Sequence, residues 1–172
     1  MRPRIALERA DSGETRISKI IELVSESKYG IHDISRITAS KKGEIFRLNM
    51  PFELGLDVGC RTFGNEVHNK KQCLVLEAER YRYQAALSDL SGSDIAVHRN
   101  EPEEVANQVR GWLAGQCRPK APGPAKIWGA FNDFMAANYD ALTARGFSRK
   151  DIENLAISEL IDCMEEWVRE NP

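Results

Sequence analysis

Two short segments of this 172-residue sequence carry polar side chains of the types that bind sugars and phosphates. Ser35 and Arg36 follow a predicted strand, and their hydroxyl and guanidinium groups can hold a ribose hydroxyl or a phosphate. Asn49 and Glu53 lie at the start of a predicted helix, where asparagine is a favoured N-cap and glutamate suits the positive end of the helix dipole. Plainer interpretations remain open, because loop residues are commonly solvated and glutamate near a helix start is a common capping residue.

Two further residues extend this polar set. Asp33 lies beside His32 in a predicted strand at residues 29–34, so the two side chains should point to opposite faces of the sheet. A polar pair in an otherwise apolar strand indicates a site, although an edge strand or a turn-capping aspartate explains it equally well. Tyr81, within residues 77–83, can stack on a base, or it can pack at the start of a helix.

The remaining pattern alternates strands with helices. We predict strands at residues 4–7, 29–34, 73–76 and 94–98, and helices at residues 17–24, 49–61, 81–90 and 102–113. The continuous apolar run at 73–76 is typical of a strand that is buried on both faces. This order predicts an α/β fold with a parallel sheet covered by helices. Ligands of such sheets bind beyond the carboxyl ends of the strands, so residues 33–36, 49–53 and 77–83 should converge there.

The chain divides at a stretch rich in proline and glycine. We expect an α/β domain over residues 1–114, a linker over 115–126 and a helical extension over 127–172. The extension should hold two helices, the second opened by a capping box that begins at Ser148. Exposed apolar residues on this pair, including Phe131, would form a patch that binds a second copy of the chain.

Composition narrows the class of protein. Hydrophobic residues make up 42% of the chain, enough for a core, and 24 Lys and Arg against 26 Asp and Glu argue against a general nucleic-acid binder. No apolar run is long enough to span a membrane and no secretory signal is recognised, so the expected location is cytoplasmic. The four cysteines are widely spaced, which predicts free thiols, and no metal site or resident cofactor is expected.

Three parts of the sequence resemble a known superfamily. They are residues 31–35, the Asn-Met-Pro-Phe-Glu-Leu-Gly-Leu segment of residues 49–56, and the lysine-led apolar strand of residues 71–76. Together they are similar to the core of TIR-like and nucleoside 2-deoxyribosyltransferase-like proteins, over roughly residues 4–113. The resemblance implies a flavodoxin-like sheet. It also implies that residues 4–7 correspond to the family's second strand, so that its first strand has no counterpart in this chain.

The resemblance also implies an activity. Glu53 corresponds to the carboxylate that cleaves N-glycosidic bonds in these families, with NAD or another nucleotide as substrate. A carboxylate suits that reaction, because it can stabilise or attack the positive charge that develops on the sugar. Substrate contacts would then fall on the polar residues described above, namely Asp33, Ser35, Arg36, Asn49 and Tyr81. The alternatives are a nucleotide-sensing or self-association module without catalysis, or an incomplete, inactive relative.

Overall fold

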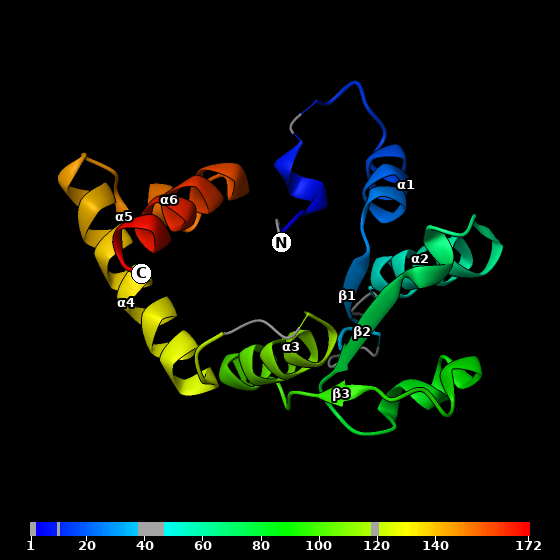
Figure 1. The fold of residues 1–172 in the computed structure, drawn as a ribbon. Helices are drawn as coiled ribbons and strands as arrows, with labels where there is room; N and C mark the ends of the chain where they lie inside the picture. Colours follow the sequence, from blue (N-terminus) through cyan, green and yellow to red (C-terminus); the bar gives the residue numbers. More distant parts are fainter. Residues whose placement is uncertain (1–2, 10, 38–46, 118–120) are drawn as a thin grey trace, which may run out of the picture. The chain divides into compact units, whose positions relative to one another are not determined.

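A three-stranded parallel sheet organises the centre of the chain in this computed structural model, which describes residues 3–9, 11–37, 47–117 and 121–172 (Figure 1). The strands are β1 (Tyr29–Asp33), β2 (Gln72–Glu77) and β3 (Ala96–Val97), in the order β1-β2-β3. Each lies within or close to a strand predicted from the sequence. The α/β class, with a parallel sheet and surrounding helices, is therefore confirmed.

Helices cover both faces of the sheet. These are α2 (Asn49–Phe63) and α3 (Pro102–Cys117), while α1 (Arg16–Glu26) packs against α2. In β1, His32 contacts α2 through Asp57, whereas the ring of Tyr29 lies 5.6 Å from that of Trp112 in α3. Side chains three residues apart in a strand point to opposite faces, so α2 and α3 lie on opposite sides of the sheet.

The core lies between the sheet and α2. Buried side chains from both the strand ends and the helix make one cluster, consisting of Ile34, Ile37, Leu54, Val75 and Tyr83. This cluster fixes α2 against β1 and β2, because such apolar burial is the main favourable contribution to folding. The start of α2 is thereby held close to the carboxyl ends of both strands.

The first predicted strand is wrong. Residues 4–7 do not pair with the sheet, and Ala6–Glu8 forms a short 3₁₀ helix, η1, instead. Among the described residues, β1 consequently has β2 as its only neighbour in the sheet. An arginine followed by three apolar residues is too short a pattern to exclude a helical turn, so the pattern alone was ambiguous.

Two other predicted boundaries differ. The helix expected at 81–90 is two 3₁₀ helices, η3 (Arg82–Ala85) and η4 (Ser88–Leu90), while η2 (His68–Lys70) precedes β2. The helix expected to end near Leu113 continues to Cys117. The predicted linker at 115–126 is therefore shorter at both ends, and part of it, residues 118–120, lies outside the described residues.

Residues 1–12 and 122–172 form a second unit, and residues 13–121 form the unit that contains the sheet. The second unit contains α4 (Pro124–Ala144), α5 (Arg149–Glu153) and α6 (Ile157–Glu170). Phe134 is buried and packs 6.0 Å from the ring of Trp167, which joins α4 to α6. The predicted capping box at Ser148 is present, because Ser148 and Asp151 exchange side-chain to backbone hydrogen bonds, but it opens only the five-residue α5.

Candidate functional site

Glu53 lies in the second turn of α2 and faces α1. Its side chain is 16% exposed and forms an ion pair with the guanidinium of Arg16, whose Nη2 is 3.7 Å from Glu53 Oε1. That separation is an ion pair without the short contact of a hydrogen bond. Oε1 itself is buried and has no hydrogen-bond partner among the residues that the structure describes, a rare condition for a carboxylate oxygen in a folded protein.

The capping interpretation of Glu53 is wrong. The residue before the helix is Leu48, and α2 begins at Asn49, which makes Glu53 the fifth helical residue. No side chain caps this helix, and Asn49, predicted as the N-cap, is instead its exposed first residue. Glu53 therefore lies beyond the orphan amides of the first turn, which are the groups that a capping carboxylate satisfies.

The predicted convergence of residues 33–36 with 77–83 is confirmed. Arg82 joins them, because its Nη2 donates hydrogen bonds of 2.6 Å both to the carbonyl oxygen of Ser35 and to Glu77 Oε1. Glu77 is fully buried, and its hydrogen bond and negative charge raise the pKa of Arg82 above its ordinary value, so the guanidinium stays charged. This bridge ties the carboxyl end of β2 to the turn that follows β1.

Asp33 closes the same turn. Its Oδ1 accepts a 2.9 Å hydrogen bond from the backbone N–H of Ser35, so the turn-capping explanation for Asp33 holds. The same oxygen lies 3.5 Å from Nε2 of His98, a buried side chain that follows β3. His98 Nδ1 accepts a hydrogen bond from the N–H of Asn100, which leaves the proton on Nε2, facing Asp33.

The backbone after β2 and β3 adopts an unusual conformation at this end of the sheet. The backbone φ angles of Tyr81, Arg99 and Asn100 are 65°, 54° and 60°. These values lie in the left-handed region, which residues other than glycine rarely adopt. Such conformations cluster at functional sites, where surrounding contacts hold them in place. All three residues follow strand ends, where open parallel sheets bind their ligands.

The remaining residues predicted to bind substrate differ in their exposure to solvent. Arg36 and Asn49 are exposed, and Tyr81 is 62% exposed with the guanidinium of Arg80 5.7 Å from its ring centre. Ser35, in contrast, is buried, so the solvated-loop interpretation is wrong for this residue. The packing role proposed for Tyr81 belongs to Tyr83, which lies in the core.

A buried cluster of charged groups was missed by sequence reasoning. Asp57 Oδ2 lies 2.9 Å from His32 Nε2, and Asp57 Oδ1 forms an ion pair of 3.1 Å with Lys71 Nζ. Lys71 also donates hydrogen bonds to the carbonyl oxygens of Val24 and Ser27, so its interpretation as a solvated charge is wrong. The signal that was available is Asp57 itself, a carboxylate on the same face of α2 as the core residue Leu54.

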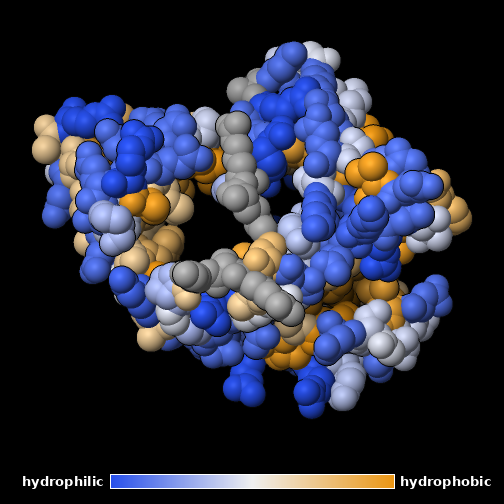
Figure 2. Space-filling view, viewed as in Figure 1, coloured by the Kyte–Doolittle hydropathy of each residue, from blue (hydrophilic) through white to orange (hydrophobic). Residues whose placement is uncertain are grey.

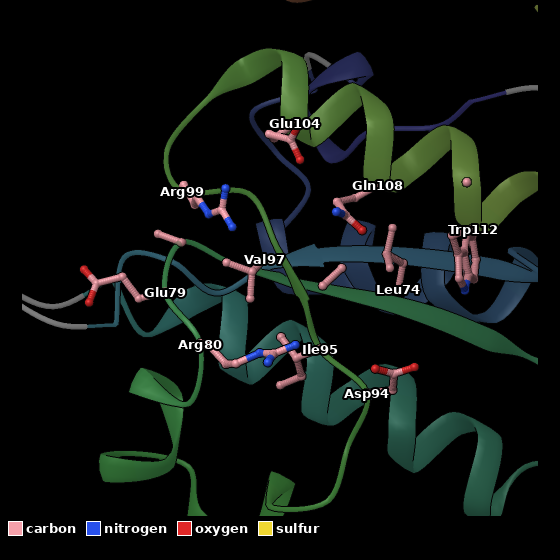
Figure 3. A pocket seen from close by; sticks show the side chains of 13 residues that line it. Leu74, Glu79, Arg80, Asp94, Ile95, Val97, Arg99, Glu104, Gln108 and Trp112 are labelled. Carbon is pink, nitrogen blue, oxygen red and sulfur yellow. The ribbon is translucent and has the colours of Figure 1, made fainter. Parts of the chain in front are cut away.

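A cavity of about 970 Å³ opens along β3, between the sheet and α3 (Figure 3). Trp112 and Leu74 lie at one end, whereas Arg99 and Glu79 lie at the other, beyond the ends of the strands. Its lining does not include Glu53. Tyr81 lines a smaller neighbouring hollow of about 140 Å³.

Neither known proteins nor a set of metal ligands indicates a family for this chain. No protein-family model, curated protein or solved structure matches this chain. Within the described parts of the chain, no group of three or more His, Cys, Asp or Glu side chains could hold a metal ion. None of the helices described is long and apolar enough to cross a membrane.

Proposed function

We propose that the unit of residues 13–121 cleaves the N-glycosidic bond of a nucleotide, with Glu53 as the carboxylate that acts on the sugar. The observation that carries this proposal is the buried Oε1 of Glu53, which has no hydrogen-bond partner and does not cap its helix. An unpartnered buried oxygen is costly, and a hydroxyl of the sugar arriving at it would supply the missing hydrogen-bond donor.

The neighbourhood of Glu53 favours one kind of leaving group. The charged partner described for Glu53 is Arg16, and a guanidinium does not release a proton at physiological pH. A nicotinamide ring bound to ribose is already cationic and departs as a neutral molecule, so that no acid is needed. We therefore place NAD first among the nucleotides to test, before ordinary nucleosides, whose bases need a proton donor to leave.

The chemistry assigned to Glu53 is electrostatic or nucleophilic. As the bond to the base lengthens, positive charge grows on the sugar, and the carboxylate stabilises it or bonds to it. The guanidinium of Arg16 is 57% exposed and stands 3.7 Å away, which leaves the carboxylate without a close hydrogen-bonded contact to this cation.

In this proposal, residues at the carboxyl end of the strands bind the substrate. Asp33 is 46% exposed and can accept a hydrogen bond from a ribose hydroxyl, and Arg36 and Asn49 are free in solvent to contact a phosphate or sugar. Tyr81 offers an exposed ring for stacking on the base. A flavodoxin-like arrangement, and kinship with the TIR-like and deoxyribosyltransferase-like proteins, belong to the same proposal.

The test compares wild type, Glu53→Gln and Glu66→Gln, each incubated with NAD and with deoxynucleosides, with the released base measured by chromatography. Glu66 is an exposed carboxylate of the same unit and serves as the matched control. Glu53→Gln should lose on the order of 10²–10³-fold in rate, the usual effect of removing one preorganised electrostatic contact. The melting temperature should hardly change, because the amide has nearly the same size.

Two results would contradict the proposal. Equal turnover by wild type and Glu53→Gln would remove Glu53 from the reaction. Nucleotide binding by the wild type with no base released would instead support a nucleotide-sensing module without catalysis.

A further inference from the structure

The outer side of α2 carries large apolar side chains that are left in solvent. Phe63 is 89% exposed and Phe52 is 58% exposed. With 100° between successive helical residues, Phe52, Leu56, Gly59 and Phe63 fall within about 60° of one another, on one stripe. This α2 stripe is a continuous surface, because residues three and four apart are neighbours on a helix.

The opposite side of α2 already supplies the packing of its own unit. Leu54 and Asp57, the buried residues of the helix, lie about 160° and 140° around from Phe52. The apolar α2 stripe is therefore additional to the face that the sheet covers. A helix that is apolar on two opposite sides is typical of one packed between two neighbours.

Gly59 in the α2 stripe and Gly55 beside it leave a notch that the packing of the described residues does not require. A Cβ added at Gly55 or Gly59 would meet nothing within 4 Å. Glycine within a helix is less favourable than alanine, so packing inside this chain gives no reason for either residue. A helix from another molecule, approaching closely at this notch, would give one.

We propose that two copies of this chain pair through their α2 stripes, antiparallel about a twofold axis. Such a pairing, centred between residues 57 and 58, places Phe52 of each copy opposite Phe63 of the other. It also places Leu56 of each copy opposite Gly59 of the other. A leucine therefore packs against a glycine near the centre of the interface, and two phenylalanine rings face each other at each end. This arrangement has the self-complementarity that a twofold interface requires.

The apolar area suits an interface of modest size. A phenylalanine buries about 150–250 Å² when fully covered, so the exposed parts of the four rings together would remove on the order of 600 Å² from water. Stable interfaces bury about 1,200–2,000 Å² in total. The rings thus supply roughly half of the lower value, and Leu48, 58% exposed and next to the stripe, adds to it.

Other exposed apolar residues are less suited to the role. Hydrophilic residues dominate the visible surface, with smaller hydrophobic areas among them (Figure 2). In α4, Phe131, Met135 and Tyr139 are 39–44% exposed, less than either phenylalanine of the α2 stripe. Those residues belong to the helical extension, which we predicted from the sequence alone to mediate self-association.

The experiment measures the mass of the full-length chain by sedimentation over a range of concentrations. The wild type should dimerise. Phe63→Glu should raise the dissociation constant by at least about 100-fold, because a large aromatic residue is lost, and a charge is buried, in both copies of the interface. Gly59→Leu should also break the dimer by filling the notch, yet its monomer should melt at the same or a higher temperature, because leucine favours the helix.

A compensating variant tests the register. Leu56→Ala combined with Gly59→Leu exchanges the large and small positions, so the double variant should dimerise more tightly than Gly59→Leu alone. Ile21→Glu on α1 and Phe131→Glu on α4 change exposed apolar residues elsewhere and should leave the dimer intact. A monomeric wild type, or a dimer that survives Phe63→Glu and is lost in Phe131→Glu, would overturn the proposal.

Discussion

Replacing Asp57 by asparagine should be among the most destabilising single changes in the sheet-containing unit. Asp57 and Lys71 have side chains that are 5% and 4% exposed, and the lysine ammonium lies 3.1 Å from the carboxylate. Asparagine can still offer an amide oxygen to the ammonium, as can the carbonyl groups of Val24 and Ser27, but none of these neutral acceptors replaces the negative charge. Removing one partner of a buried ion pair typically costs about 3–5 kcal/mol.

Urea unfolding of full-length variants, followed by circular dichroism, measures this loss. A cost of that size should also lower the melting temperature by about 12 °C or more. Asp33→Asn is the control, because that carboxylate is 46% exposed and should cost about 1 kcal/mol or less. The double variant Asp57→Leu with Lys71→Met should recover most of the stability, since an apolar pair can replace a buried ion pair. A loss below about 1 kcal/mol for Asp57→Asn would refute the account of this cluster.

The pH dependence follows from the same contacts. Burial alone would raise the pKa of Asp57, but the hydrogen bond with His32 and the attraction of Lys71 lower it below its ordinary value of 3.8. A lowered pKa means that the folded chain holds the charged form more strongly than the unfolded chain does. The stabilisation is therefore complete above pH 3.8 and is lost as the pH falls through the lower folded value. The stability difference between wild type and Asp57→Asn should shrink in that acidic range.

Three further changes test local features. Gly30→Ala should cost about 3 kcal/mol in urea unfolding, because the added Cβ would lie 2.1 Å from Asp57 Oδ2. In the same assay Gly111→Ala should stabilise α3 by about 0.5–1 kcal/mol, because its added Cβ would meet nothing within 4 Å. Thr15→Ala removes the side chain that caps α1 and should cost about 1 kcal/mol in the same assay, with Thr15→Ser close to wild type. Burial and the charge of Asp57 raise the pKa of the Cys73 thiol, so a thiol reagent should modify exposed Cys117 well before Cys73; equal rates would contradict this.

Strong local signals in the sequence were sufficient for much of the fold. The apolar run at 73–76 has the composition of a strand covered on both sides, and it is β2. The Ser148 to Asp151 capping box depends on contacts between near neighbours, so it forms as predicted. Residues 4–7 lacked such a signal, and their apparent strand is a 3₁₀ helix.

The site depended on contacts that a single sequence does not reveal. Lys71 adjoins Lys70, and such pairs are usually solvated, yet Lys71 is buried because Asp57 and two carbonyl oxygens from the end of α1 surround it. His98 and Asp33 are 65 positions apart by their numbering and meet only because β1, β2 and β3 stand in that order. Glu53 was identified from its motif, but its missing hydrogen bond became visible only with the positions of α1 and α2.

The division of the chain into units also bears on its synthesis. Residues 1–12 belong with residues 122–172, and η1 contacts α6, so the second unit is assembled from the two ends of the sequence. On the ribosome, the unit of residues 13–121 can therefore complete its sheet while α6 is still untranslated. The segment that contains η1 must wait for the last helix. Folding is expected to finish with the second unit, after the sheet has formed.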